Sequence, residues 1–294
     1  MKALAVDGGG IRGLIPALVL AEIEQRTGRA MATMVDFIAG TSTGAIIACA
    51  LAKPHAMPAA RIAEIYEQDG PKIFDASLLR RIVTADGYIN ERYSDRGLLQ
   101  SLSTHLGEVR LSEATVRVLI TTYDLQGRAA LLLRSDADDI GMVDAAHASS
   151  AAPTYFEPLH LGDRTYVDGG VGAINPSLYA YAEAGGRPTL LLSLGTGELT
   201  RPLPYEKVKD WGKLEWAAPI VDVIFDAGSD AVEAQLEALM HDSYIRLQTR
   251  LTEASDSLDD ASAENLAALR REAEKLIAAR SADIDRACEL LTSA

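Results

Sequence analysis

The 294-residue chain contains only two cysteines, Cys49 and Cys288, and each lies in an apolar, helix-like context. So few thiols exclude a disulfide framework and favour a reducing compartment, which makes the cytoplasm the expected location. The sequence also lacks any run of the roughly 18 to 20 apolar residues that a membrane-crossing helix requires. The apolar stretch at the N-terminus ends at Asp7, which is too soon for a secretory signal. Any contact with a membrane is therefore expected to be peripheral.

Basic side chains are scarce relative to acidic ones: 28 lysines and arginines face 42 aspartates and glutamates, a net charge of −14. This balance excludes a nucleic-acid polymer as the partner, because such binding relies on cationic side chains that meet phosphates. The same charge provides no long-range attraction to an anionic lipid surface. A protein of this composition that acts on membranes would need a local docking patch.

The first 52 residues repeat one arrangement twice: a short apolar strand, a glycine turn and a helix. Residues 4–6 form the first predicted strand, and apolar residues at helical spacing follow over 14–26. Residues 35–39 form the second strand, which leads through a glycine turn into the almost wholly apolar helix 45–52. Because strands that alternate with helices build parallel sheets, we predict an α/β fold whose largely parallel sheet is covered by helices.

Further strands are predicted at 117–123, 130–134, 165–167 and 189–194, and a long helix at about 217–240. The acidic stretch after residue 253 has apolar residues near helical spacing, with an interruption at Arg280. We expect residues 1–250 to form the main domain. Residues 251–294 are expected to form an acidic helical extension packed on that domain, and the alternative is a helix that binds a partner.

The segment Gly40-Thr41-Ser42-Thr43-Gly44 lies between an apolar strand and an apolar helix, which is the nucleophile-elbow pattern. A serine on such a sharp turn is held in strained backbone geometry, and the flanking glycines remove the β-carbons that would clash. The following helix directs its amides and the positive end of its dipole at the reacting oxygen. Ser42 is therefore the candidate nucleophile. The alternative is a serine that caps a helix at an ordinary glycine turn.

The glycine run that follows the first predicted strand has two interpretations. Gly8, Gly10 and Gly13 satisfy the G-x-G-x-x-G spacing of a dinucleotide-binding loop. That fingerprint also needs an acidic residue on a second strand about 20 residues later, to bind the ribose. Asp36 instead opens the strand that ends in the serine elbow, which weakens the nucleotide interpretation.

The second interpretation is an oxyanion hole, in which the amides of Gly9 and Gly10 bind the carbonyl oxygen of the substrate. One such donor contributes about 10²–10³ in rate. We favour this interpretation because a candidate nucleophile follows so closely in the chain. Arg12 would then support the loop or meet a phosphate headgroup.

A serine hydroxyl needs a proton acceptor, which is usually a histidine. The five histidines are His55, His105, His147, His160 and His241. His241 follows Ser42 and Asp168 in the chain order of an α/β-hydrolase triad, yet it lies at the end of the long predicted helix, where histidines are commonly solvated. The triad is therefore kept only as an alternative.

Asp168 has the better setting for a base. It ends a predicted strand and precedes Gly169 and Gly170, which allow a backbone or a ligand to approach closely. The competing interpretation is an Asx-type turn aspartate. Because a carboxylate with a pKa near 4 is a poor base for serine, burial would have to raise that pKa or close contact would have to offset the mismatch.

Four segments together resemble the patatin-like phospholipases. They are Asp7-Gly-Gly-Gly-Ile-Arg-Gly13, the elbow 40–44, Ser149-Ser-Ala-Ala-Pro-Thr-Tyr-Phe156 and Asp168-Gly-Gly-Val-Gly-Ala-Ile-Asn-Pro176. Residues 193–197 and 244–248 are also similar to that family, so the resemblance covers about residues 1–250. The one departure is Ile174, where the family often has a second asparagine.

The resemblance implies a three-layer α/β/α sandwich related to the catalytic domains of cytosolic phospholipase A2. It implies catalysis by a Ser42–Asp168 dyad without histidine, metal or other cofactor, and without a calcium requirement. The glycines Gly8, Gly9 and Gly10 with Arg12 would supply the oxyanion hole. The motifs also suggest supporting roles, which we assign to Gly169, Gly170, Pro153 and Asn175.

The implied substrate is a membrane phospholipid or another acyl lipid, cleaved by a cytoplasmic enzyme that associates transiently with the membrane surface. Residues 71–83 combine apolar and basic side chains that could contact lipid, namely Phe74, Leu78, Leu79, Arg80 and Arg81, although an ordinary helix with its apolar side in the core is the favoured interpretation. Three other functions are left open: a small-ester esterase with a Ser–Asp–His triad, an effector switched on by a cyclic nucleotide or other small-molecule activator, and a non-catalytic nucleotide-binding or scaffold module.

Overall fold

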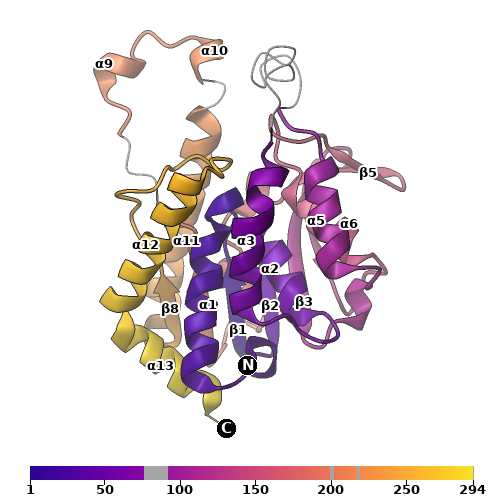
Figure 1. The fold of residues 1–294 in the computed structure, drawn as a ribbon, viewed down its shortest axis with the longest axis vertical. Coiled ribbons are helices and arrows are strands. Elements are labelled where there is room, and N and C mark those ends of the chain that lie inside the picture. Colours follow the sequence, from indigo (N-terminus) through magenta and orange to yellow (C-terminus); the bar gives the residue numbers. More distant parts are fainter. Residues whose placement is uncertain (76–91, 199–201, 217–218, 294) are drawn as a thin grey trace.

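The computed structural model describes residues 1–75, 92–198, 202–216 and 219–293 (Figure 1). A central sheet of eight strands has the order β5-β6-β3-β2-β1-β7-β8, and β4 pairs with β3 outside this path. The strands are β1 (Lys2–Val6), β2 (Phe37–Gly40), β3 (Arg117–Asp124), β4 (Ala129–Arg134), β5 (Leu159–Leu161), β6 (Arg164–Asp168), β7 (Leu190–Leu194) and β8 (Tyr244–Leu247).

The five strands β3, β2, β1, β7 and β8 are parallel, whereas β4, β5 and β6 add antiparallel pairs. The predicted strands 117–123 and 130–134 are present as the antiparallel pair β3 and β4. The expectation of a largely parallel sheet is therefore confirmed. Short β5 is an addition that no sequence signal had indicated.

The register of the sheet brings the predicted site residues to one edge. Val6, the last residue of β1, lies opposite Gly40, the last residue of β2. Gly40 in turn pairs with Ile120 of β3, and Thr122 of β3 pairs with Asp168 at the end of β6. The glycine loop, the serine elbow and the candidate base therefore leave the sheet side by side, although they are far apart in sequence.

Side-chain alternation along the strands divides the core into two layers. Leu4 and Val6 of β1 point to one face, while Ala3 and Ala5 point to the other, as the two-residue period of a strand requires. One face packs against α1 (Leu14–Thr27), α2 (Thr43–Ala52), α3 (Ala59–Ile73), α5 (Arg96–Leu106) and α6 (Met142–Ser150). The other packs against α8 (Ser177–Glu183) and α11 (Pro219–Met240). The three-layer α/β/α arrangement is confirmed.

Residues after β8 return to the body of the protein. The helices α12 (Ala263–Ala279) and α13 (Ser281–Thr292) lie beside α1, and the break between them falls at Arg280 (Figure 1). Leu269 and Ala273 of α12 share the core with α1, and the Lys2 Nζ group donates to the Leu291 carbonyl over 3.1 Å. Among the described helices, none is long and apolar enough to cross a membrane.

Candidate active site

Ser42 occupies the turn between β2 and α2 in a strained backbone conformation, with φ 54° and ψ −118°. The two glycines of the elbow make this turn possible. A β-carbon on Gly44 would lie 2.1 Å from the carbonyl oxygen of Val6, and one on Gly40 would lie 2.3 Å from the carbonyl oxygen of Gly44. Helix α2 therefore starts in direct contact with the end of β1. The Ser42 N–H donates to the Ser149 Oγ over 2.8 Å, which ties the elbow to α6.

The Ser42 hydroxyl donates to the Asp168 carboxylate, with 2.6 Å between Oγ and Oδ2. The other carboxylate oxygen, Oδ1, accepts from the Gly170 N–H over 2.7 Å. Gly169 allows this approach because a β-carbon there would lie 2.2 Å from the Thr121 Oγ1. Both members of the pair are buried, so the carboxylate is oriented by two donors and shielded from bulk water.

Burial raises the pKa of Asp168 to about 6, although the hydrogen bonds from Ser42 and Gly170 oppose the shift. The physical cause is the cost of holding a charge in a low-dielectric site. A carboxylate with this pKa is a stronger base than an ordinary aspartate and is still ionised at neutral pH. The environment thus supplies the basicity that the sequence argument required of Asp168.

The glycine loop presents two amides to the site. The Gly8 N–H donates to the Ile174 carbonyl over 2.9 Å and is therefore not available as an oxyanion donor. Within the described part of the chain, the N–H groups of Gly9 and Gly10 have no hydrogen-bond acceptor, and both residues line the pocket that contains Ser42. Of the predicted oxyanion-hole glycines, Gly9 and Gly10 thus have free amides, while Gly8 has a structural contact.

The glycine loop leaves little space for a bound nucleotide. Gly10 has a left-handed φ of 55°, and a β-carbon on it would lie 2.1 Å from the carbonyl oxygen of Leu258. That carbonyl also accepts the Ile11 N–H over 2.9 Å. The segment that contains Leu258 thus packs directly against this side of the loop.

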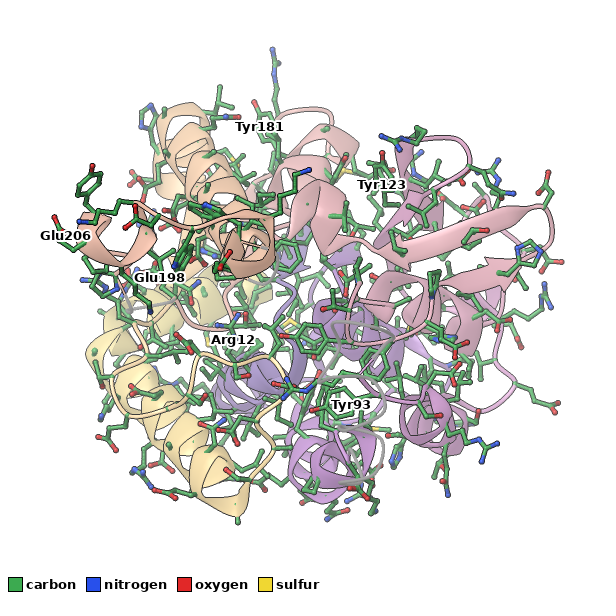
Figure 2. All side chains as sticks on the ribbon, turned by 90° about the horizontal axis from the view of Figure 1, so that it is seen from above. Arg12, Tyr93, Tyr123, Tyr181, Glu198 and Glu206 are labelled. Atoms are coloured by element: carbon green, nitrogen blue, oxygen red, sulfur yellow. The ribbon has the colours of Figure 1, made fainter. Side chains whose placement is uncertain are left out.

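Arg12 supports the loop from within. Its side chain is buried, and its Nε donates to the Gly9 carbonyl over 3.4 Å. Figure 2 views the molecule from above and shows Arg12 near the centre, with Tyr93 to one side. Of the two roles considered for Arg12, this contact favours support of the loop.

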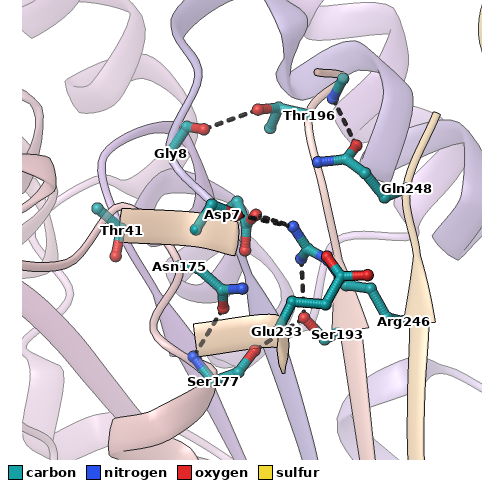
Figure 3. A network of polar contacts seen from close by, with 12 residues as sticks. Asp7, Gly8, Thr41, Asn175, Ser177, Ser193, Thr196, Glu233, Arg246 and Gln248 are labelled. Atoms are coloured by element: carbon teal, nitrogen blue, oxygen red, sulfur yellow. Dashed lines mark hydrogen bonds and ion pairs between the residues drawn. The ribbon is translucent and has the colours of Figure 1, made fainter. Parts of the chain in front are cut away.

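A buried ion pair lies below the glycine loop and was not anticipated from the sequence (Figure 3). The Arg246 Nη2 of β8 lies 2.6 Å from the Asp7 Oδ2, and the same guanidinium donates to the Ser193 Oγ over 2.8 Å and to Glu233 over 3.2 Å. Burial raises the pKa of Asp7, and the adjacent guanidinium opposes that shift. The sequence signal for this pair is Arg246 itself, because an arginine within an apolar strand needs a buried partner.

Replacing Arg246 with methionine is expected to lower the free energy of unfolding by about 3–5 kcal/mol, because Asp7 would be left buried without its counter-charge. The double variant Asp7→Asn/Arg246→Met should recover a large part of that loss, since it removes both charges. Denaturant unfolding of the wild type, the two single variants Asp7→Asn and Arg246→Met, and the double variant measures the coupling free energy between the two residues. If the stability losses of the two single variants add up to the loss of the double variant, the two residues do not act as a pair.

The pocket above Ser42 is mainly apolar and opens to solvent. Its deeper lining comes from α2, α3 and α5: Ile46, Ala50, Ile62, Ile73, Leu98 and Leu102. Phe225 of α11 and Leu258 of the C-terminal segment complete it, and neither had a recognisable sequence signal. A pocket of this lining accepts a hydrocarbon chain.

The remaining predicted site residues have mainly structural contacts. Thr41 Oγ1 donates to the Ala173 carbonyl over 2.8 Å, and Thr43 Oγ1 is hydrogen-bonded to the Tyr66 hydroxyl. Asn175 is buried, and its Oδ1 accepts the Ser177 N–H over 3.0 Å at the start of α8. Pro153 lies in the turn that links α6 to the following segment.

Phe74, a predicted membrane contact, lies at the pocket in the structure. Its ring is partly buried, packs edge-on against Tyr93 with centroids 5.6 Å apart, and lines the pocket. The ring is thus packed against the core, and its contact with a membrane stays a prediction. Leu78, Leu79, Arg80 and Arg81 lie outside the described residues.

Among the described residues, the hydroxyl of Ser42 is hydrogen-bonded to Asp168 and to no histidine. His241 is exposed in the turn after α11 and does not line the pocket. His105 does line it, but its Nε2 lies 2.8 Å from the Asp69 Oδ2. The His105 carbonyl accepts from Lys53, at the opposite end of α2 from Ser42.

The variants His241→Ala and His105→Gln are each expected to keep ester turnover within about threefold of the wild type, because neither side chain reaches the nucleophile. Initial rates with a soluble ester check this expectation. A loss of about 10³-fold or more in either folded variant would instead indicate a histidine base.

The fold and the site together have the form of a serine ester hydrolase built on an α/β sandwich. The family model "Patatin-like phospholipase" matches residues 4–181, and the chain belongs to this family of lipid acyl hydrolases.

Its relatives extend over most of the chain. It is 32% identical to "Patatin-like protein 2" from Arabidopsis thaliana, covering 93% of this chain and 82% of the relative. It is 29% identical to "Probable inactive patatin-3-Kuras 1" from Solanum tuberosum, covering 94% and 86%. Among solved structures it is similar to VipD from Legionella pneumophila, with a TM-score of 0.44, 11% identity and coverage of 95% of this chain and 67% of VipD.

Proposed function

We propose that the protein is a calcium-independent phospholipase A- or lysophospholipase-type enzyme that uses Ser42 and Asp168. The observation that carries this proposal is the 2.6 Å hydrogen bond between the Ser42 hydroxyl and a buried carboxylate. The pair lies in an apolar pocket that also contains two unoccupied amides. These are the three parts of acyl transfer: a nucleophile with its base, an oxyanion site and a binding site for the acyl chain.

In the first step Asp168 accepts the hydroxyl proton while the Ser42 Oγ attacks the carbonyl carbon of the ester. The carbonyl electron pair moves to the oxygen, which is stabilised by the N–H groups of Gly9 and Gly10. When the tetrahedral intermediate collapses, the bond to the lipid alcohol breaks and the departing alcohol takes the proton from Asp168. The acyl chain is then esterified to Ser42.

In the second step a water molecule gives a proton to Asp168 and attacks the acyl carbon. The Ser42 Oγ leaves and regains the proton, and the fatty acid is released. One carboxylate serves both steps, because its raised pKa allows it to accept and return a proton near neutral pH.

The apolar pocket supports a long-chain substrate. Each methylene group transferred from water to such a lining contributes about 0.8 kcal/mol, so several groups separate a fatty-acyl ester from a short ester by orders of magnitude. This argument favours a lipid acyl hydrolase over the small-ester esterase, which would gain nothing from the lining along α3 and α5.

The deciding experiment measures fatty-acid release from mixed phospholipid vesicles and from lysophospholipid micelles, with and without a calcium chelator. We expect release that the chelator does not change, and a covalent acyl adduct on Ser42 when the reaction is quenched early. Turnover confined to short soluble esters would contradict the assignment to lipids. An activity that the chelator removes would contradict calcium independence.

A further inference from the structure

Both tryptophans of the protein lie in one segment that extends from the body. Trp211 and Trp216 stack edge to face, with ring centroids 5.1 Å apart, around the short helices α9 (Tyr205–Val208) and α10 (Lys213–Trp216). In Figure 1 these helices stand away from the sheet, beyond the N-terminal end of α11. Figure 2 likewise shows Glu206 of α9 at the outer edge of the molecule. An aromatic pair in such a position contributes little to the core.

The adjoining half of α11 has an apolar outer face. Ile220, Val223 and Ile224 are 39%, 40% and 53% exposed, and Tyr205 of α9 is 73% exposed. The three α11 residues follow helical spacing, and Ile224 immediately precedes Phe225, which lines the pocket. Exposed aliphatic side chains that adjoin each other usually mark a contact surface.

This surface reaches the mouth of the catalytic pocket. Phe225 lies close enough to Gly170 that a β-carbon there would be 3.1 Å from its ring, and Gly170 binds the Asp168 carboxylate. The next residue, Val171, is 40% exposed. Phe225 therefore connects the apolar surface, through its neighbour Ile224, to the loop that binds the Asp168 carboxylate.

We propose that residues 202–216 and 219–227, together called the docking arm, insert into the interface of a zwitterionic phospholipid bilayer and place the pocket mouth against it. The proposal rests on the function proposed above. Tryptophan and tyrosine favour the bilayer interface, because each has an apolar ring and a polar group. Aliphatic side chains beside them would enter the acyl boundary.

The charge of the docking arm indicates which kind of bilayer it would bind. Between residues 202 and 216, three lysines face three acidic residues, and Lys209 is paired with Glu206 over 2.6 Å. Asp226 adds negative charge on α11, and the whole chain carries −14. The arm thus has no cationic excess that would attract an anionic surface. Docking is expected to depend on apolar insertion, and salt should have little effect on it.

The test uses tryptophan fluorescence, since the arm holds both tryptophans. In a Ser42→Ala background, which keeps the lipid intact, phosphatidylcholine vesicles should shift the emission to the blue. Lipids brominated on the acyl chain should quench it. Half-molar salt should leave binding within about twofold, and added phosphatidylserine should weaken it.

Ile224→Glu and Leu239→Glu form a matched pair on the same helix, because the two side chains are 53% and 55% exposed but lie at opposite ends of α11. We expect Ile224→Glu to weaken vesicle binding about tenfold or more and Leu239→Glu to change it less than twofold. Both variants, made in the active enzyme, should keep wild-type rates on a soluble ester.

Absence of a blue shift and of quenching would overturn the proposal, as would equal losses in the two glutamate variants. A dimer in light scattering that Ile224→Glu converts to a monomer would also overturn it, since a second copy would then cover the arm. Vesicle binding without any lipid hydrolysis by the wild type would support the docking arm and contradict the proposed function instead.

Discussion

Replacing Ser42 with alanine is expected to lower kcat for fatty-acid release by about 10⁴–10⁶-fold, the range found when other hydrolases lose their nucleophile. The reason is that the hydroxyl bonded to Asp168 supplies the oxygen of the covalent intermediate, and no other group replaces it. The residual rate would come from the oxyanion amides and the pocket alone. Product formation over hours, measured by fatty-acid titration or mass spectrometry, determines the ratio.

Ser150 provides a matched control for this substitution. It lines the same pocket and is also buried, and its Oγ has no hydrogen-bond partner in the described part of the structure. Ser150→Ala should therefore retain turnover within about threefold, since the removed hydroxyl takes part in no bond. If Ser42→Ala kept a tenth of the activity while Ser150→Ala lost it, the nucleophile would have been assigned to the wrong serine.

Replacing Asp168 with asparagine is expected to reduce kcat by about 10³–10⁴-fold, because the amide keeps the shape of the carboxylate but cannot accept the hydroxyl proton. In the wild type, the base must be ionised to act. The rate on a soluble ester should therefore rise with pH and level off above about 6, the pKa to which burial raises Asp168. A rate profile that is flat between pH 4 and 8 would remove Asp168 from the mechanism.

The same substitution should make the protein more stable at neutral pH. Burial raises the pKa of Asp168 from 3.8 to about 6, so between these values the folded protein holds a proton that the unfolded chain has lost. The wild type is therefore expected to lose stability as the pH rises through this window, and the loss persists above it. Two pKa units correspond to about 3 kcal/mol.

Asparagine does not titrate, so the stability advantage of Asp168→Asn over the wild type should grow by up to about 3 kcal/mol between pH 4 and pH 7. Denaturant unfolding at several pH values measures this difference. An advantage that shrinks as the pH rises would mean that the folded protein stabilises the charged carboxylate. Together with the loss of activity, the predicted result would describe a base kept at a cost in stability, as is common for functional sites.

Local signals in the sequence indicated the proposed reacting groups and determined the class of fold. Gly40 and Gly44 around Ser42, and the glycines after Asp168, are readable because tight turns restrict which residues can occupy them. The alternation of short apolar strands with helices indicated a parallel sheet, because apolar residues recur with different periods in strands and in helices. These features depend on neighbours within a few residues, and the family resemblance added the pairing of Ser42 with Asp168.

Only the tertiary structure decided which parts of the chain complete the site. The distance between Ser42 and Asp168 depends on the register of β2, β3 and β6. Leu258 reaches the glycine loop from a segment with no recognised motif, and Arg246 neutralises Asp7 from 239 positions away. Such contacts leave no local pattern, because they depend on how strands align and helices pack after the chain has folded. The sequence thus indicated the proposed reacting groups, while packing determined the environment of Asp168, the lining of the pocket and the surface around its mouth.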